Sequence, residues 1–196
     1  MITHPVSVGR MDWVTPLGKT TIATKQKDPS WRPPKSIKKE AAQDGKVLPD
    51  VIPAGPDNPL GRYAMRLGIP GYLIHSTNKP YGVGMRVTHG CVRMYPEDIE
   101  ALFNDIPVGT PVQLVNQPIK LGWLADTLFI ELHPPLDEDL ARYEDYLQRV
   151  LDAIAEVVAD RDTTLEGESA RHFTLNGRAI RQAVEEKNGI PVAISR

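Results

Sequence analysis

The sequence predicts a mainly β domain over residues 1–134, with a short helix after its only cysteine, and a helical extension over residues 135–196. Three observations lead to this fold class. Short apolar stretches that alternate with polar residues recur before residue 134. Proline is dense between positions 29 and 80 and nearly absent from 137 to 190. From Asp137 onward, apolar residues instead follow the spacing of an amphipathic helix.

Length and composition fit one domain with an appendage. The chain has 196 residues, of which 41% are hydrophobic, enough for a packed core. A net charge of −2 and scattered Lys and Arg argue against a nucleic-acid partner. No apolar run approaches the roughly 20 residues of a membrane span. One cysteine cannot form an internal disulfide, which is compatible with the cytosol and also with an oxidising compartment.

The first third of the chain predicts two strands joined by a turn, and then a long loop. Residues 5–24 alternate as strand, turn and strand, with the turn at Thr15-Pro16-Leu17-Gly18. Residues 28–62 are rich in proline and form a loop, interrupted by one short helix over residues 36–44. A loop this long in a compact domain is usually functional, and its proline content favours a stiff lid or groove wall.

The next segments predict short strands around one helix. Strands are expected at residues 63–67 and 72–75, followed by a glycine-containing loop over residues 78–87. Tyr95-Pro96-Glu97-Asp98 then opens a helix, because proline and acids suit its first turn. Further strands are expected at residues 112–115 and 127–132.

The C-terminal region predicts two helices. The first shows an apolar stripe with the i, i+3, i+4, i+7 spacing, and a second, shorter helix is expected from Arg178 to about Lys187. The stripe of the first helix consists of Leu140, Tyr143, Leu147, Val150, Leu151, Ile154, Val157 and Val158. We expect this region to pack on the β-rich part as an appendage.

The reactive side chains gather around the cysteine. Cys91 has His89 two residues before it and Arg93 two residues after it, and His75 lies sixteen positions upstream. A thiol, imidazoles and a guanidinium are the groups needed for a nucleophile with a base and an anion clamp. Gly90 permits a sharp turn that would aim the backbone N–H groups of residues 90 and 91 at an oxyanion. Arg93 is suited to bind a substrate carboxylate.

Composition and spacing leave other readings open. A lone cysteine is often a small buried apolar side chain, and a histidine at a strand end is often structural. His75, His89, Cys91 and His133 are also residue types that bind zinc, although a His-x-Cys pair is not a common structural zinc spacing. Arg93 is equally suited to a surface salt bridge.

Two runs resemble a known family. Ile74-His75-Ser76-Thr77-Asn78 and Thr88-His89-Gly90-Cys91-Val92-Arg93-Met94 resemble the signature of the L,D-transpeptidase catalytic domain (YkuD-type). The flanks resemble its Gram-negative, periplasmic (ErfK/YbiS-like) branch. These flanks are residues 15–18, 53–61, 96–99 and 107–112. The similarity covers roughly residues 4 to 134.

This resemblance implies a β-sandwich or barrel-like catalytic domain and a cysteine acyltransferase without a metal or organic cofactor. Cys91 would attack the L-centre carbonyl of diaminopimelate in a peptidoglycan tetrapeptide stem and release D-Ala. An amine would resolve the thioester: a second stem's diaminopimelate (a 3→3 cross-link), an outer-membrane lipoprotein lysine or a free D-amino acid. His75 would be the base, with the Ser76 carbonyl orienting it. His89, Gly90 and Arg93 would shape the site and bind substrate.

The beginning of the chain departs from this branch. Members carry a signal peptide and a first β-hairpin before the position that corresponds to Met1, so we expect a domain that lacks its first strands and has no readable signal peptide. Periplasmic location is implied by the resemblance alone. The alternative functions are a catalytically silent fragment that binds the cell wall and a zinc site at His75, His89 and Cys91.

Overall fold

The chain forms two compact units in a computed structural model that describes residues 2–164 and 173–196. The first unit is Met1–Val115 and the second is Asn116–Arg196. The boundary was expected after residue 134, but the structure divides the chain between residues 115 and 116. The strands between residues 116 and 134 therefore belong to the second unit rather than to the first. The physical reason is that their apolar side chains pack against the C-terminal helices.

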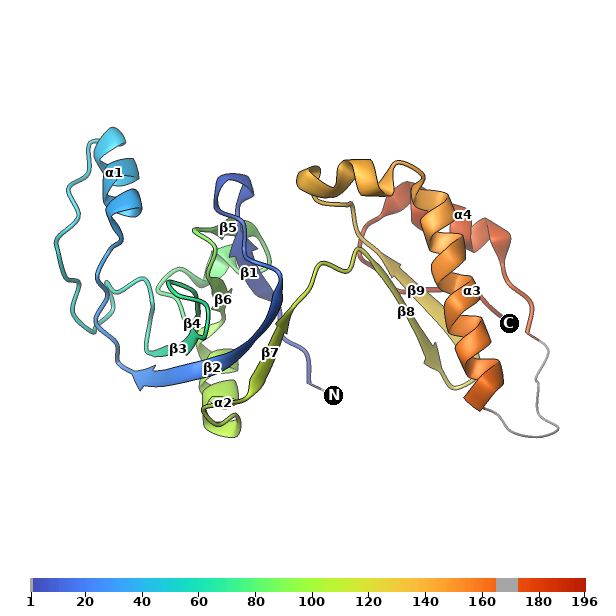
Figure 1. Ribbon diagram of the computed structural model, residues 1–196, viewed down its shortest axis with the longest axis horizontal. Coiled ribbons are helices and arrows are strands. Elements are labelled where there is room, and N and C mark those ends of the chain that lie inside the picture. Colours follow the sequence, from blue (N-terminus) through green and yellow to red (C-terminus); the bar gives the residue numbers. More distant parts are fainter. Residues whose placement is uncertain (1, 165–172) are drawn as a thin grey trace. The chain divides into compact units, whose positions relative to one another are not determined.

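The first unit is built on a curled mixed sheet (Figure 1). Among the described residues, seven strands form it in the order β5-β1-β6-β4-β3-β2-β7. Strands β4 and β6 run parallel, as do β1 and β5, while the other neighbours are antiparallel. The strands are β1 (Val6–Gly9), β2 (Gly18–Lys27), β3 (Tyr63–Leu67), β4 (Leu73–His75), β5 (Arg86–Thr88), β6 (Val92–Met94) and β7 (Pro111–Leu114).

Helix α2 (Pro96–Asp105) closes one face of this sheet over the apolar core. The buried core side chains are Ile22, Tyr63, Met65, Leu67, Ile74, Val92, Met94 and Ile99. The Lys25 ammonium on β2 holds the end of the helix by donating to the backbone carbonyls of Phe103 and Ile106. Such carbonyls have no partner within a helix, so the contact fixes where α2 ends against the sheet.

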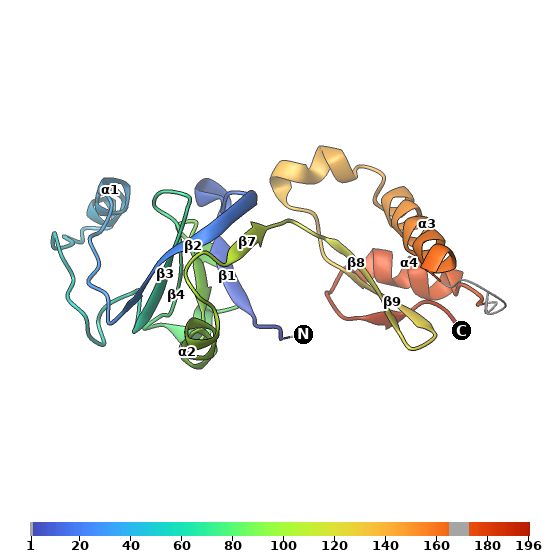
Figure 2. The same cartoon turned by 60° about the horizontal axis from the view of Figure 1, so that its bottom comes forward.

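The opposite face of the sheet carries polar side chains because strand residues alternate between faces. Met65 and Ile74 point into the core, whereas their neighbours Arg66 and His75 line a cavity on the other side. The long loop and its helix α1 (Lys35–Gln43) lie on this second side, away from α2 (Figure 2).

A buried asparagine organises the long loop. The Asn58 side chain is fully buried and donates to the carbonyls of Pro29 (2.7 Å), Ile52 (3.4 Å) and Pro53 (3.0 Å). Its oxygen accepts from the Leu60 N–H at 2.9 Å. Because one amide joins both ends of the loop, a segment with few regular elements has a defined shape, as the expected groove wall requires.

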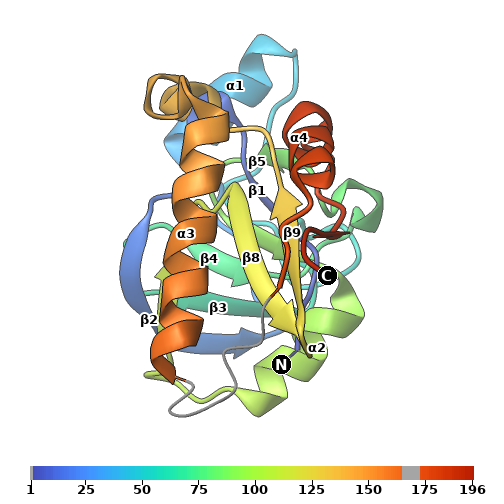
Figure 3. The same ribbon diagram turned by 90° about the vertical axis from the view of Figure 1, so that its right-hand side faces the viewer.

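The second unit is a small sheet with both helices on one face (Figure 3). Within its described part, three antiparallel strands lie in the order β10-β9-β8. Its elements are β8 (Ile119–Leu124), β9 (Thr127–Leu132), a 3₁₀ helix (Asp137–Tyr143), α3 (Tyr146–Thr164), α4 (Gly177–Glu186) and β10 (Val192–Ala193). The extension expected to be helical is therefore an α/β unit. No helix in the described residues is long and apolar enough to cross a membrane.

The expected elements agree best where periodicity is strong. Strands β3 and β9 have the expected bounds, and α1, α2, β4, β7 and α4 agree within two residues. The long C-terminal helix begins at Tyr146 rather than near Asp137, whose acidic segment forms the 3₁₀ helix. Strands β5, β6, β8 and β10 and the 3₁₀ helices Met11–Trp13 and Pro80–Gly82 were not predicted.

We expect Asn58→Ala to destabilise the first unit. The change removes the amide donor from three carbonyls, although that of Ile52 still accepts from the Trp31 N–H, and it leaves the Leu60 N–H without its acceptor. Buried groups left unpaired in this way cost about 2–4 kcal/mol together. Urea unfolding measures the loss, and trypsin digestion followed by mass spectrometry should show faster cleavage within residues 30–57. Asn104→Ala, at an exposed position of α2, is the matched control. Equal unfolding midpoints for the two variants would contradict the role of Asn58.

Candidate active site

Cys91 and His75 are brought to the same face of the sheet by neighbouring parallel strands. His75 is the last residue of β4, and Cys91 directly precedes β6. The register pairs Ile74 with Val92 and His75 with Arg93. Ile74 and Val92 point into the core, so the alternation directs His75, Arg93 and Cys91 to the opposite side. The two residues predicted to react are thus placed on one surface by strand pairing.

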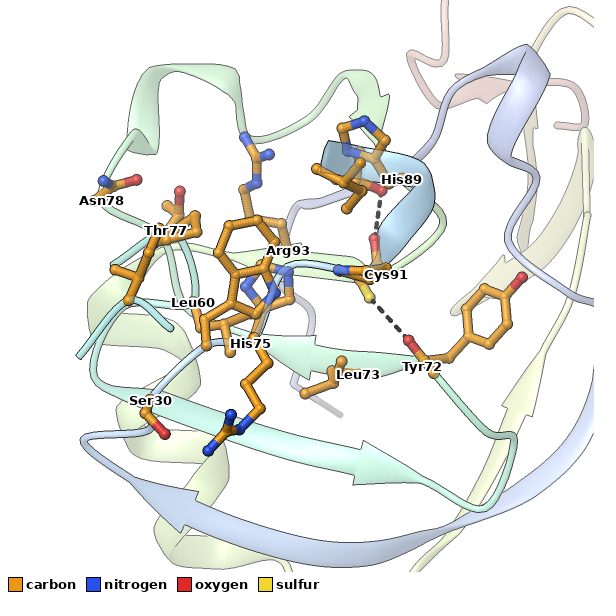
Figure 4. A pocket seen from close by; sticks show the side chains of 18 of the residues that line it. Ser30, Leu60, Tyr72, Leu73, His75, Thr77, Asn78, His89, Cys91 and Arg93 are labelled. Carbon is orange, nitrogen blue, oxygen red and sulfur yellow. Dashed lines mark hydrogen bonds between the residues drawn. The ribbon is translucent and has the colours of Figure 1, made fainter. Parts of the chain in front are cut away.

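This surface is the floor of a cavity of about 750 Å³. Figure 4 shows His75, Cys91 and Arg93 around it, with Tyr72 and Leu73 beside the sulfur. The long loop supplies much of the wall, as its proline content predicted. The wall residues from this loop are Ser30, Trp31, Arg32, Pro34, Ser36, Ile37, Leu48, Ile52, Asp57, Pro59 and Leu60.

The His75 imidazole is buried and held in one tautomer. Its Nδ1 lies 2.5 Å from the Ser76 carbonyl oxygen. Because a carbonyl only accepts hydrogen bonds, Nδ1 carries the proton and Nε2 has the free lone pair. Burial lowers the pKa of His75 to about 4, the Ser76 hydrogen bond opposes this, and the nearby charge of Arg93 adds to it. The ring is therefore a neutral proton acceptor at neutral pH.

The Cys91 thiol is half-buried and also favours its neutral form. Its Sγ lies 3.8 Å from the Gly71 carbonyl oxygen. Burial raises the pKa of the Cys91 thiol, while a backbone hydrogen bond from Leu73 and the charge of Arg66 act in the opposite direction. The Cys91 thiol and the His75 imidazole, which would form an ion pair if the proton moved between them, are thus both uncharged before substrate binds.

The turn before the cysteine is fixed by glycine and threonine. Gly90 has φ +96°, a conformation that suits glycine, and a Cβ there would lie 2.8 Å from the Tyr72 ring. The Thr15 hydroxyl donates to the Gly90 carbonyl (2.9 Å), and the Thr88 hydroxyl donates to the Cys91 carbonyl (2.6 Å). The predicted sharp turn is present, and the two threonines that hold it were not identified from the sequence.

His89 contacts the loop helix. Its Nε2 lies 2.7 Å from a carboxylate oxygen of Glu40 on α1, and Arg10 pairs with the same carboxylate. These two hydrogen bonds hold the pKa of Glu40 below its usual value. The Trp13 ring meets the imidazole edge to face, with centroids 5.0 Å apart. His89 therefore joins the wall of the cavity to the turn, and no sequence pattern pointed to Glu40.

Arg93 lies beside His75 in the register and is partly buried. Burial lowers the pKa of its guanidinium, and its Nε has no hydrogen-bond partner among the described residues. A partly desolvated guanidinium facing a cavity is suited to bind an anion.

The four residues considered for zinc belong to different units. His133 belongs to the second unit, where its Nε2 lies 2.7 Å from Glu131. Across residues 2–164 and 173–196, no group of three or more His, Cys, Asp or Glu side chains is arranged to bind a metal ion.

Known proteins resemble the chain over most of its length. "Probable L,D-transpeptidase ErfK/SrfK" of Escherichia coli strain K12 is 36% identical over 97% of this chain and 59% of that protein. "Probable L,D-transpeptidase YbiS" of the same strain is 42% identical over 74% of this chain and 47% of that protein. The chain thus spans about half to three fifths of these relatives' length.

Solved structures and a family match extend the comparison. A crystal structure of L,D-transpeptidase 3 from Mycobacterium tuberculosis, in complex with a faropenem-derived adduct, aligns with a TM-score of 0.44. It shares 24% identity and covers 58% of this chain and 44% of that chain. Residues 1–114, nearly the whole first unit, match the YkuD family, described as the L,D-transpeptidase catalytic domain. The chain therefore belongs to the L,D-transpeptidase catalytic domain family.

Proposed function

We propose that this chain is a cysteine L,D-transpeptidase that acts on peptidoglycan stem peptides, with Cys91 as nucleophile and His75 as base. The observation that carries the proposal is the placement of both side chains on one face of neighbouring parallel strands, at the floor of the cavity. Membership of the family supports the reaction class. The names of the similar proteins agree with it.

The first half-reaction acylates the enzyme. The free Nε2 of His75 accepts the thiol proton while Sγ of Cys91 attacks the L-centre carbonyl of diaminopimelate in a tetrapeptide stem. The carbon–sulfur bond forms as the bond to the D-Ala nitrogen breaks, and the imidazolium returns its proton to the departing amine. The Ser76 carbonyl keeps Nδ1 protonated throughout, so the same nitrogen, Nε2, acts as base and acid.

The second half-reaction transfers the acyl group to an amine. The acceptor nitrogen attacks the thioester, gives its proton to His75, and the proton passes to the departing sulfur. The acceptors that fit this chemistry are a second stem's diaminopimelate, which gives a 3→3 cross-link, a lysine of an outer-membrane lipoprotein, or a free D-amino acid. A periplasmic location, where these substrates meet, is part of the proposal. Gly90 would shape the oxyanion pocket, and His89 would hold the turn next to it.

Acylation tests the proposed nucleophile. Incubation with a carbapenem should add the mass of one drug molecule, because a strained acyl donor suits a thioester-forming site. Incubation with a purified tetrapeptide should release D-Ala. Cys91→Ala should lose both reactions, and intact-mass spectrometry with chromatography of the peptide follows them. A folded protein that binds muropeptides but stays unmodified and releases no D-Ala would favour the silent wall-binding alternative.

Alkylation at varied pH tests the neutral resting state. Because burial raises the thiol pKa, the rate of Cys91 alkylation by iodoacetamide should keep rising beyond pH 9.0, the ordinary thiol value. His75 loses its charge near pH 4 and is neutral throughout this range, so His75→Ala should leave the profile nearly unchanged. A plateau below pH 8 that disappears in His75→Ala would instead reveal a thiolate–imidazolium pair.

A further inference from the structure

The cavity around Cys91 is lined by positive charge. Its described lining residues include four permanently cationic side chains and a single carboxylate, that of Asp57. The cationic side chains are Arg32, Arg66, Lys79 and Arg93. A cleft with one sign of charge attracts ligands of the other sign, so this cavity is built for an anionic substrate. Stem peptides end in a carboxylate, which one of these four cations could bind.

Arg66 is the cation of this cavity whose charge reaches the sulfur. It faces away from the core on β3, and the register sets it opposite Leu73, whose backbone hydrogen-bonds to the Cys91 sulfur. Its charge lowers the pKa of the Cys91 thiol, against the larger effect of burial. Arg93, by comparison, lies opposite His75 and acts on the imidazole.

The Arg66 guanidinium is also without a protein partner. Over the part of the chain that the structure describes, no side chain or carbonyl forms an ion pair or hydrogen bond with it. Arg10 and Arg62 of the same unit, by contrast, are paired with Glu40 and Asp28. An unpaired guanidinium that faces a cavity next to a nucleophile is free to bind a planar anion with two parallel hydrogen bonds.

Substrate geometry selects one carboxylate. In the proposed reaction, Cys91 attacks a carbonyl whose leaving group is a terminal D-amino acid. The carboxylate of that residue is three bonds from the carbonyl carbon, so the two carbon atoms are about 3–4 Å apart. The other stem carboxylates are more bonds away. The terminal carboxylate is therefore the stem carboxylate held closest to the attacked carbonyl, within reach of a cation in the cavity that contains Cys91.

We propose that Arg66 is a specificity-determining residue that binds the terminal carboxylate of the acyl donor. The proposal rests on the function proposed above and assigns to that site a preference for donors with one residue beyond the scissile bond. A donor whose terminal carboxylate is further away, or is blocked, would leave the guanidinium unpaired and react slowly.

Matched substrates test this assignment. A tetrapeptide acid and its C-terminal carboxamide give the same acyl-enzyme, because the leaving residue carries the only difference. Intact-mass spectrometry measures the rate at which each substrate forms the acyl-enzyme. The ratio of the two rates therefore reports recognition of the terminal carboxylate. The wild-type protein should prefer the acid by about 10- to 100-fold, as expected for a charge-assisted bidentate contact.

Substitution of Arg66 should remove this preference. In Arg66→Gln, acylation by the acid should fall to within about threefold of that by the carboxamide, and Arg66→Lys should keep part of the ratio because a point charge replaces the fork. Arg62→Gln, an exposed arginine beside β3, should keep the wild-type ratio. Loss of thiol activation or of folding would slow both substrates alike, so the ratio isolates the carboxylate contact.

Two results would overturn the assignment. An unchanged ratio in Arg66→Gln, with active enzyme, would refute the role of Arg66 and leave the proposed function standing. A ratio that instead follows amidation of the diaminopimelate side-chain carboxylate would place Arg66 at that group. Failure of the wild-type protein to be acylated by any tetrapeptide would refute the proposed function itself.

Discussion

The parallel pairing of β4 with β6 is the constraint on which the site depends. Each of these strands has three residues. Their pairing directs Ile74 and Val92 to the core, and it directs His75 and Arg93 to the cavity on the other face. A shift of one residue would reverse every side chain and bury the polar groups instead. The core contacts of α2 with this sheet therefore fix the geometry of the candidate site from the opposite face, without any contact to substrate.

The wall of the cavity depends on polar contacts rather than on an apolar core. Helix α1 has no buried residue, and it is held by Glu40, which contacts His89 and Arg10. Asn58 joins the two ends of the same loop. Contacts of this kind are directional, so they can define a shape with little apolar burial. The turn that precedes Cys91 and the wall above it are in this way parts of one hydrogen-bonded arrangement.

Periodicity was sufficient to predict β3 and α2. The family signature pointed to His75 and Cys91, and strand pairing places both side chains on one face of the sheet. Strand β6 was missed because three residues carry no readable alternation. Strand β8 was missed although Ile119, Leu121 and Trp123 do alternate, and that alternation would have moved the boundary to residue 115. The contact between Glu40 and His89 joins residues 49 positions apart, so no local pattern could have predicted it.

Burial gives this site its chemical character. The same desolvation raises the pKa of Cys91 and lowers that of His75, so an ion pair is disfavoured before substrate binds. In the proposed reaction, charge then appears only as the thiol proton moves, inside a cavity where each charge interacts strongly with its neighbours. The Leu73 backbone hydrogen bond and the Arg66 guanidinium oppose the effect of burial at the sulfur. A substrate carboxylate bound to Arg66 would neutralise the charge that lowers the pKa of the Cys91 thiol, until the leaving group departs with the carboxylate. In this way, recognition of the donor would be coupled to the protonation of the thiol.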